Sequence, residues 1–327
     1  MIPKHETHHD EVELLQKLAK VRPDLAFDQP YEVRQGREAV VFIFETDVVR
    51  FQKEDHPDIK HALLEKEITD KMAGQEHYMV PVFSYLRPDG SMTIQNRMPG
   101  DVIIQEDGPD KIGALKISKM SPDDKQQFVK GVASFMAYLH NKSRTGEISY
   151  NLNTSETLHI DSAKSEIKKF LNICPDQKLK ESLSGLLTVP EDKDTVLLHS
   201  DLNAGNIFYD SNKKSVGIID FGLAAQGPAS ADLAYFIKMP QELYISIVNE
   251  YNQRSTVAVD YRQPLAYNAA LWSQSYMSNP DNPDMQAYAL AGLKHIADIL
   301  RETKEPKSVG TATKPASRPQ SPAVRPT

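Results

Sequence analysis

The chain has 327 residues, of which 40% are hydrophobic and 25% charged, so it can bury a sizeable core and form two lobes. Its single cysteine, Cys174, excludes an intrachain disulfide and a thiolate metal cluster, which fits a reducing compartment. No stretch approaches the run of about 18 apolar residues that spans a bilayer, and the N-terminus lacks the apolar segment of a signal peptide. We therefore expect a cytoplasmic protein with no membrane partner.

The formal net charge of −7 is unevenly distributed along the chain. Residues 303–327 hold five Lys or Arg and one Glu, a net of +4, so the preceding 302 residues carry −11. An acidic body argues against nucleic acid as a partner, because its phosphates would be repelled, and it is compatible with a cationic substrate. Acidity that only keeps the protein in solution explains the same numbers.

The first predicted elements form a small α+β unit that ends near Gly100. Apolar residues at helical spacing predict an opening helix between Val12 and Val21. Period-two patterns and turn residues then predict two pairs of strands with a helix between them. These elements are strands at 39–44 and 47–51, a helix at 61–72, and strands at 79–86 and 92–98.

Beyond Gly100 the apolar pattern is mainly helical. Ser121 is a suitable N-cap, with Pro122 at the first position of a helix that continues to His140. Two more helices are expected at 265–277 and 285–300. The last segment has five prolines and almost no large apolar residue, which predicts disorder. The expected organisation is an N-terminal lobe at 1–100, a helical lobe at 101–302 and a tail at 303–327.

Three acceptor side chains occur in the segment 197–222, LLHSDLNAGNIFYDSNKKSVGIIDFG. Short apolar runs on either side of the polar residues 210–214 predict an antiparallel hairpin with its turn centred near Lys213. Asn206 and Asp220 then lie seven residues on either side of the centre, and both emerge at the open end of the hairpin. An amide oxygen and a carboxylate suit Mg²⁺, which takes further ligands from phosphate.

Asp201 precedes this hairpin and enters the same end of it. A third acidic group beside a metal–phosphate centre suits accepting a proton from an attacking hydroxyl. Any one of the three residues alone is better explained as an ordinary turn residue, but H-x-D-x-x-x-x-N followed fourteen residues later by D-F-G is far more specific. We expect His199 to hold the backbone of the loop rather than to react.

These residues resemble the aminoglycoside phosphotransferase family, which is related to choline kinase and shares the protein-kinase-like fold. HSDLNAGNIF is similar to the family's catalytic loop, with Ser200 where Gly is usual, and VGIIDFGLAAQGPASADLAYF is similar to its metal-binding segment, with Pro228 where Asp is common. The resemblance implies Asp201 as the catalytic aspartate, with Asn206 and Asp220 as magnesium ligands. It also implies a bilobal α+β fold, with a small antiparallel sheet in the N-lobe and a mainly helical C-lobe.

The resemblance extends more weakly from Val33 to Leu300, and it assigns nucleotide contacts to the N-lobe. Arg50 stands where the fold usually places a lysine for the phosphates, with Lys53 as an alternative, and Glu67 stands where its partner glutamate belongs. An Arg50–Glu67 pair could also be a surface ion pair only. The other implied positions are the turn 35–38 with Gly36 over the phosphates, a hinge at Gln95, Asn96 and Met98 that reads the base, and Asp232 as a mainly structural residue.

The leading interpretation is a magnesium-dependent small-molecule kinase that transfers the γ-phosphoryl group of ATP or GTP to a hydroxyl. The acidic body weakly favours an amine-bearing acceptor, aminoglycoside-like or choline-like. A protein kinase shares the two motif spacings, but the chain lacks G-x-G-x-x-G, His-Arg-Asp and A-P-E. A catalytically silent nucleotide-binding scaffold is the third alternative, and the oligomeric state stays open. His5, His8 and His9 are expected to be solvated rather than bound to metal.

Overall fold

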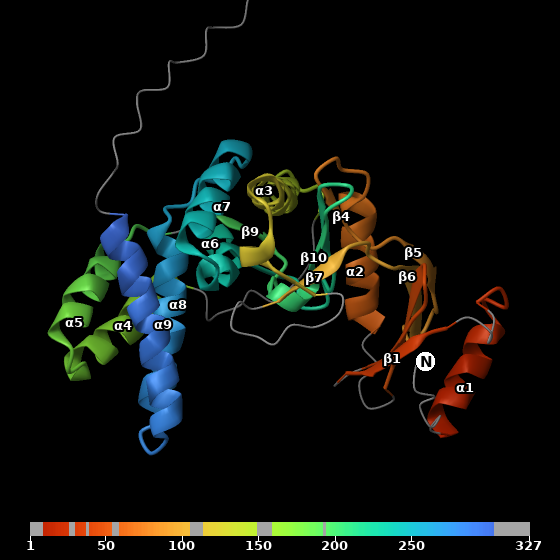
Figure 1. The fold of residues 1–327 in the computed structure, drawn as a ribbon, viewed down its shortest axis with the longest axis horizontal. Helices are drawn as coiled ribbons and strands as arrows, with labels where there is room; N and C mark the ends of the chain where they lie inside the picture. The colour runs from red at the N-terminus through yellow and green to blue at the C-terminus, as the bar shows by residue number, and fades with distance from the viewer. Residues whose placement is uncertain are drawn as a thin grey trace, which may run out of the picture.

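The computed structural model describes residues 9–25, 30–36, 39–53, 59–104, 114–148, 159–191 and 194–303. A small antiparallel sheet lies at one end of the molecule and a group of helices lies at the other, with a second sheet between them (Figure 1). The predicted tail beyond Thr303, and His5 and His8, lie outside the described residues, as does the side chain of His9. None of the helices in the described ranges is both long and apolar enough to cross a membrane.

The first sheet forms the outer end of the small lobe. Its strand order is β1-β2-β3-β6-β5, and all of its pairs are antiparallel. Helix α1 (His9–Ala19) packs Leu15 and Leu18 against the sheet in a core of their own, together with Phe42 and Phe51. The opening helix and the β2–β3 hairpin were predicted, whereas β1 is polar and exposed and has no apolar alternation to reveal it. The strands are β1 (Glu32–Gln35), β2 (Ala39–Ile43), β3 (Asp47–Gln52), β5 (Phe83–Leu86) and β6 (Met92–Asn96).

The second sheet has the order β4-β11-β10-β7-β8 and includes the predicted hairpin. The expected strand at 79–86 is in fact two strands, β4 in the second sheet and β5 in the first, with Pro81 between them. Proline has no N–H for a sheet ladder, so the chain leaves one sheet and enters the other there. The strands are β4 (Tyr78–Met79), β7 (Asp101–Ile104), β8 (Ala114–Lys116), β10 (Ile207–Asp210) and β11 (Ser215–Ile218).

Helix α2 (Ile59–Met72) lies between the first sheet and the second (Figure 1). Its buried residues Leu64, Ile68 and Met72 belong to the large core of the C-terminal part, not to the core under the first sheet. The helix is therefore anchored on the C-terminal part while it stands beside the nucleotide lobe that the sequence predicted.

Helices make up most of the C-terminal part, and the predicted ones are present. Ser121 caps α3 (Pro122–Arg144), since its hydroxyl accepts the N–H of Asp124 at 3.1 Å. Helix α8 packs against α4 and α9, and α3 packs against α7. The other elements are α4 (Ile160–Ile173), α5 (Gln177–Ser184), α6 (Ala229–Leu233), α7 (Gln241–Arg254), α8 (Arg262–Ser278), α9 (Pro283–Glu302), four 3-10 helices η1 (Ile117–Lys119), η2 (Gly185–Thr188), η3 (Ala204–Asn206) and η4 (Ala234–Lys238), and a β9 (Thr195–Leu198) and β12 (Ala225–Pro228) pair.

Candidate active site

The β10–β11 hairpin is present, but its register differs by one residue from the prediction. Ile207 lies opposite Ile218, and the N–H of Ile219 donates to the carbonyl of Asn206 at 3.1 Å. Asn206 is therefore opposite Ile219 and not opposite Asp220. The side chain of Asp210 accepts two backbone N–H groups of the turn, which fixes a turn of residues 211–214 centred half a residue before Lys213.

Three non-glycine residues of this region have a left-handed backbone. Ser200 has φ 65°, Lys214 in the hairpin turn has φ 54° and Asp220 has φ 68°. Residues other than glycine rarely adopt this backbone conformation, and such backbone strain is characteristic of functional sites. The family usually has Gly where Ser200 stands, and the positive φ supplies a physical reason for it. The Ser200 hydroxyl is also buried without a hydrogen-bond partner in the described structure.

Two asparagines hold the carboxylate of Asp201. The Asn203 amide donates to Oδ1 at 2.7 Å, and the Asn206 amide donates to Oδ2 at 2.8 Å and to the Asp201 carbonyl at 2.9 Å. Each carboxylate oxygen has a further lone pair, so the group can still accept a proton. Asn203 was not predicted as a site residue. Its position two residues after Asp201 was the available signal, since a short polar side chain there can reach the Asp201 carboxylate.

Asp232 holds the backbone of this loop from its buried side. Its fully buried carboxylate accepts the N–H groups of His199 at 2.8 Å and Ser200 at 2.9 Å, and contacts Nε2 of His140 at 3.2 Å. The hydroxyl of Tyr235 also donates to the carbonyl of Ser200. Buried carboxylates persist when they are fully hydrogen-bonded, as here. These contacts agree with the structural role expected of Asp232.

His199 joins the catalytic loop to the strand that leads to Asp220. Its Nδ1 accepts the N–H of Asp201 at 3.2 Å, so Nε2 carries the proton and donates to the carbonyl of Ile219 at 3.0 Å. Burial lowers the pKa of this imidazole, which agrees with the neutral form that both contacts require. The ring packs on Phe221 with 4.6 Å between centroids. Its contacts are those of a positioning residue.

Arg50 reaches the Asp220 end of the site from β3. Its Nη1 lies 3.8 Å from Oδ1 of Asp220 and 3.9 Å from Oε2 of Glu65. Glu65 is buried on α2, and burial raises the pKa of its carboxyl to about 7 although Arg50 acts in the opposite direction. A strongly shifted carboxyl beside a specific cation is typical of functional sites.

The predicted pairing of Arg50 with Glu67 is wrong. The Glu67 carboxylate is half-exposed and lies 2.8 Å from the ammonium of Lys71. Two residues along a helix are about 200° apart around its axis, so Glu65 and Glu67 face in different directions. Glu65 lies three residues before the buried Ile68 and therefore on the same face of the helix. This spacing was the sequence signal that could have identified Glu65 as the partner.

The β1–β2 turn carries Gly36 close to Lys53. The N–H of Gly36 donates to the carbonyl of Ala39 at 2.8 Å, and the ammonium of Lys53 donates to the Gly36 carbonyl at 2.8 Å. The rest of the predicted phosphate turn, Arg37 and Glu38, lies outside the described residues. Since Lys53 is held at this turn, Arg50 is the better placed of the two to act beside Asp220.

The predicted hinge residues differ in what their backbones can offer. Gln95 lies between β3 and β5, opposite Val48 and Phe83. The N–H of Asn96 donates to Val82 at 3.1 Å, and its side-chain oxygen accepts the Val82 N–H at 2.5 Å. In the described structure the N–H of Met98 makes no hydrogen bond. Among the residues predicted for the hinge, Met98 therefore has the backbone N–H best suited to donate to a base.

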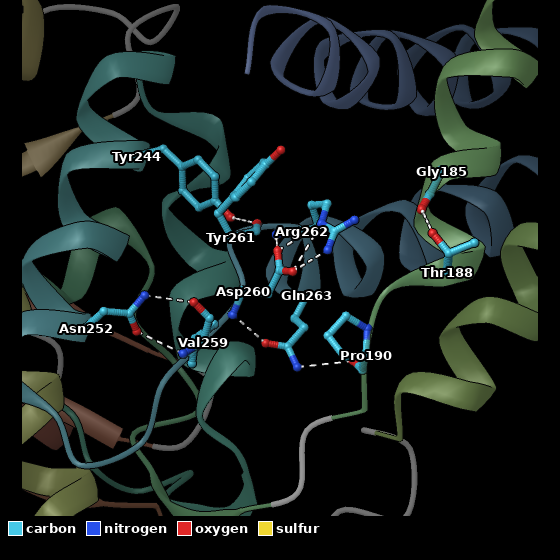
Figure 2. Close-up of polar contacts among 10 residues, drawn as sticks. All are labelled: Gly185, Thr188, Pro190, Tyr244, Asn252, Val259, Asp260, Tyr261, Arg262 and Gln263. Carbon is cyan, nitrogen blue, oxygen red and sulfur yellow. Dashed lines mark hydrogen bonds and ion pairs between the residues drawn. The ribbon is translucent and has the colours of Figure 1, made fainter. Parts of the chain in front are cut away.

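A cavity of about 720 Å³ opens from the catalytic loop into the helical part. Ser200, Leu202 and Asn203 of this loop line it, together with residues of β7, η1, β9 and α6, and residues of η4, α8 and α9 supply much of the remainder. A second cavity of about 630 Å³ lies away from this loop, between α5, η2 and the α7–α8 connection. Several of its polar side chains bond within the molecule, as in the Asp260–Arg262 ion pair and the Asn252–Val259 hydrogen bonds of Figure 2, and these contacts hold the connection in place.

The sequence model of the phosphotransferase enzyme family matches residues 32–267. The chain belongs to this family. It is assigned as a phosphotransferase, and the predicted resemblance to the aminoglycoside phosphotransferase family is confirmed. A search of curated proteins finds no match.

Solved structures of the family share the fold of this chain. The GDP complex of an aminoglycoside 2'-phosphotransferase matches with TM-score 0.60 and 17% identity, over 88% of this chain and 98% of that chain. A macrolide 2'-phosphotransferase from Brachybacterium faecium matches with TM-score 0.56 and 15% identity, over 86% and 98%. An ADP-bound aminoglycoside phosphotransferase matches with TM-score 0.52 and 16% identity, over 89% and 99%. The expected kinase-like α+β fold is thereby confirmed.

Proposed function

We propose that the protein transfers the γ-phosphoryl group of ATP or GTP to a hydroxyl of a small molecule, with Mg²⁺ as the metal ion. The observation that carries the proposal is the Asp201 carboxylate, held by two asparagines in a loop whose neighbouring residues Ser200, Leu202 and Asn203 line a cavity of about 720 Å³. One of these asparagines, Asn206, begins the hairpin that leads to Asp220. A proton acceptor, a metal-ligand pair and a cavity for an acceptor thus share one loop and one hairpin.

In the transfer, the acceptor oxygen forms a bond to the γ-phosphorus and the bond to the bridging oxygen of the β-phosphate breaks. The hydroxyl proton passes to the carboxylate of Asp201, and a nucleoside diphosphate leaves. The carboxylate is oriented before the reaction by Asn203 and Asn206, so little reorganisation is needed at that moment.

Asn206 and Asp220 fit the donor set that Mg²⁺ prefers. Both hydrogens of the Asn206 amide are used on Asp201, which leaves Oδ1 without a hydrogen bond among the described residues. The carboxylate of Asp220 is 41% exposed, so part of it is open to a ligand. A bound Mg²⁺ would neutralise charge on the phosphate oxygens.

Arg50 is the cation that we propose for the nucleotide phosphates. A guanidinium binds phosphate oxygens in bidentate fashion, and Glu65 on α2 limits where this one can lie. The relatives with solved structures hold GDP in one case and ADP in another, so both nucleotides stay in the proposal.

A protein kinase is less well supported by the region after D-F-G. Strand β12 follows at Ala225–Pro228 and pairs with β9, and α6 begins at Ala229. This segment is continuous in the described structure and leaves no length for an activation loop.

The test is nucleoside diphosphate release with ATP or GTP and Mg²⁺, over a panel of aminoglycosides, amino alcohols, sugars and apolar alcohols. We expect acceptor-stimulated release from the wild type, and a loss on the order of 10²- to 10⁴-fold in Asp201→Ala with nucleotide binding retained. The exposed Lys178→Glu is the control for surface changes. Equal release by Asp201→Ala would refute the assigned role. Silence over the whole panel, with nucleotide bound, would favour a catalytically silent scaffold.

A further inference from the structure

The cavity beside the catalytic loop differs in chemistry from the acidic body of the protein. Apolar and aromatic side chains make up most of its lining, and three of them, Leu271, Tyr288 and Tyr235, are exposed at 62%, 54% and 38%. Large apolar side chains open to solvent beside a cavity are characteristic of a binding site for an apolar ligand.

The acidic charge of the chain does not extend into this cavity. Among the described residues that line it, one carboxylate is present, that of Asp232. That carboxylate is fully buried and holds the catalytic loop through His199, Ser200 and His140. It is therefore not available to pair with an ammonium group of a ligand, as a polycationic acceptor would need.

The cavity instead carries a cation of its own. The ammonium of Lys238, on η4, lies 5.4 Å from the centre of the Trp272 ring, and Trp272 contacts Tyr288 edge to face with 5.1 Å between centroids. The face of an aromatic ring attracts a cation, and here Lys238 already occupies that position. An ammonium group of a ligand at the same face would be repelled by the charge of Lys238. Gly292 allows this arrangement, since a Cβ there would lie 2.6 Å from the Trp272 ring.

The other polar groups that line the cavity are neutral or accept hydrogen bonds. Asn268 donates its amide to the carbonyl of Ala234 at 2.8 Å, which leaves its side-chain oxygen to accept. His295 lies with Nε2 2.8 Å from the carbonyl of Ile237, so Nε2 donates and Nδ1 faces no partner among the described residues. Such groups orient hydroxyls without requiring a charged ligand.

We infer that the acceptor is a mainly apolar alcohol, neutral or anionic, with a ring system that packs on the Trp272–Tyr288 wall. The inference rests on the proposed function, because it names the substrate class of the same site. The amine-bearing acceptor expected from the net charge of the chain is not supported by these side chains.

Trp272 makes the inference testable without turnover. It is the one tryptophan of the chain, so its emission reports on this wall alone. The probes are cholic acid, its primary amide and the corresponding primary amine, which share a hydroxylated apolar ring system and differ in charge. Binding is measured by Trp272 emission and by calorimetry, with Asp201→Ala as a second protein that binds without transfer.

We expect the acid and the amide to bind about tenfold more tightly than the amine. Lys238→Glu should reverse the order of acid and amine, while Lys178→Glu, with the same change of net charge away from the cavity, should leave it unchanged. Tighter binding of the amine by the wild type, an order unaffected by Lys238→Glu, or no binding of any probe would each overturn the inference. The proposed function would survive these results as long as Mg²⁺-dependent nucleotide binding and transfer to another alcohol are found.

Discussion

Glu65 is a buried site residue that the sequence did not single out. It is a carboxyl buried on α2, and it shares the Arg50 guanidinium with Asp220. The sequence predicted the correct helix and the correct kind of partner, but it selected Glu67. The position of each glutamate around the helix axis, relative to the buried Ile68, could have distinguished Glu65 from Glu67. Which face of α2 points toward β3 depends on tertiary packing, which no local sequence pattern shows.

The buried carboxyl predicts how stability depends on pH. The pKa of Glu65 is raised in the folded protein to about 7 from the ordinary 4.5. Its contribution to stability is therefore fully present below pH about 4.5 and is lost as the pH rises through 7. Glu65→Gln does not titrate, so its free energy of unfolding should rise relative to wild type between pH 5 and pH 8, by about 3 kcal/mol at most.

Chemical denaturation of the nucleotide-free protein at a series of pH values measures this difference. Glu67→Gln is the matched control, because its side chain is half-exposed and pairs with Lys71. Parallel pH profiles for Glu65→Gln and the wild type would contradict the assignment of the raised pKa to Glu65.

Ser200 gives a second prediction at the level of a single residue. Its φ of 65° is costly for a side chain, and its buried hydroxyl has no partner in the described structure. Ser200→Gly should therefore raise the free energy of unfolding by about 1 kcal/mol, since glycine adopts positive φ without strain and removes the buried hydroxyl. Thermal unfolding checks it. A clear loss of stability would show that the hydroxyl makes a contact in solution.

At the scale of elements, several long periodic segments and one short hairpin were predicted, whereas helices α4 and α7, of 14 residues each, and several short strands were not. The opening helix, α3, α8 and α9 follow from apolar spacing, and the β10–β11 hairpin follows from its two apolar runs. Strands β1, β7 and β8 have three or four residues each and are defined by the partners they pair with. The one-residue shift in the hairpin arises because Asp210 caps the turn, which the count of residues does not reveal.

The start of β7 depends on close approach to β10, and Gly100 makes that approach possible. Gly100 has φ 88°, and a Cβ there would lie 2.3 Å from the carbonyl oxygen of Tyr209. Gly100→Ala should lower the free energy of unfolding by about 3 kcal/mol, from strain and from displacement of β10.

Gly74→Ala is the control for strain alone. Gly74 also has a positive φ, 78°, but nothing lies within 4 Å of its Cβ position. Gly74→Ala should lower the free energy of unfolding by about 1 kcal/mol. Equal losses for the two variants, measured by denaturant unfolding, would contradict the close approach of β7 and β10.

At the scale of the molecule, the site lies where two cores meet. Arg50 belongs to the first sheet, Glu65 to a helix anchored on the C-terminal core, and Asp220 to the end of the hairpin. The motif spacing predicted that Asp201, Asn206 and Asp220 gather, because they are close in sequence. Much of the lining of the cavity comes from η4, α8 and α9, which are distant in sequence from the motif, and the net charge of the chain carries no information about it.

In the proposed reaction, one centre binds the metal–nucleotide complex and accepts the proton. Calorimetric titration with ATP and with GTP, in the presence and absence of Mg²⁺, tests it without knowledge of the acceptor. We predict that Mg²⁺ strengthens nucleotide binding to the wild type and to Asp201→Ala, and that this effect is lost in Asp220→Ala and weakened in Asn206→Ala. Undiminished Mg²⁺ dependence in Asp220→Ala would contradict the assignment of Asp220 as a metal ligand.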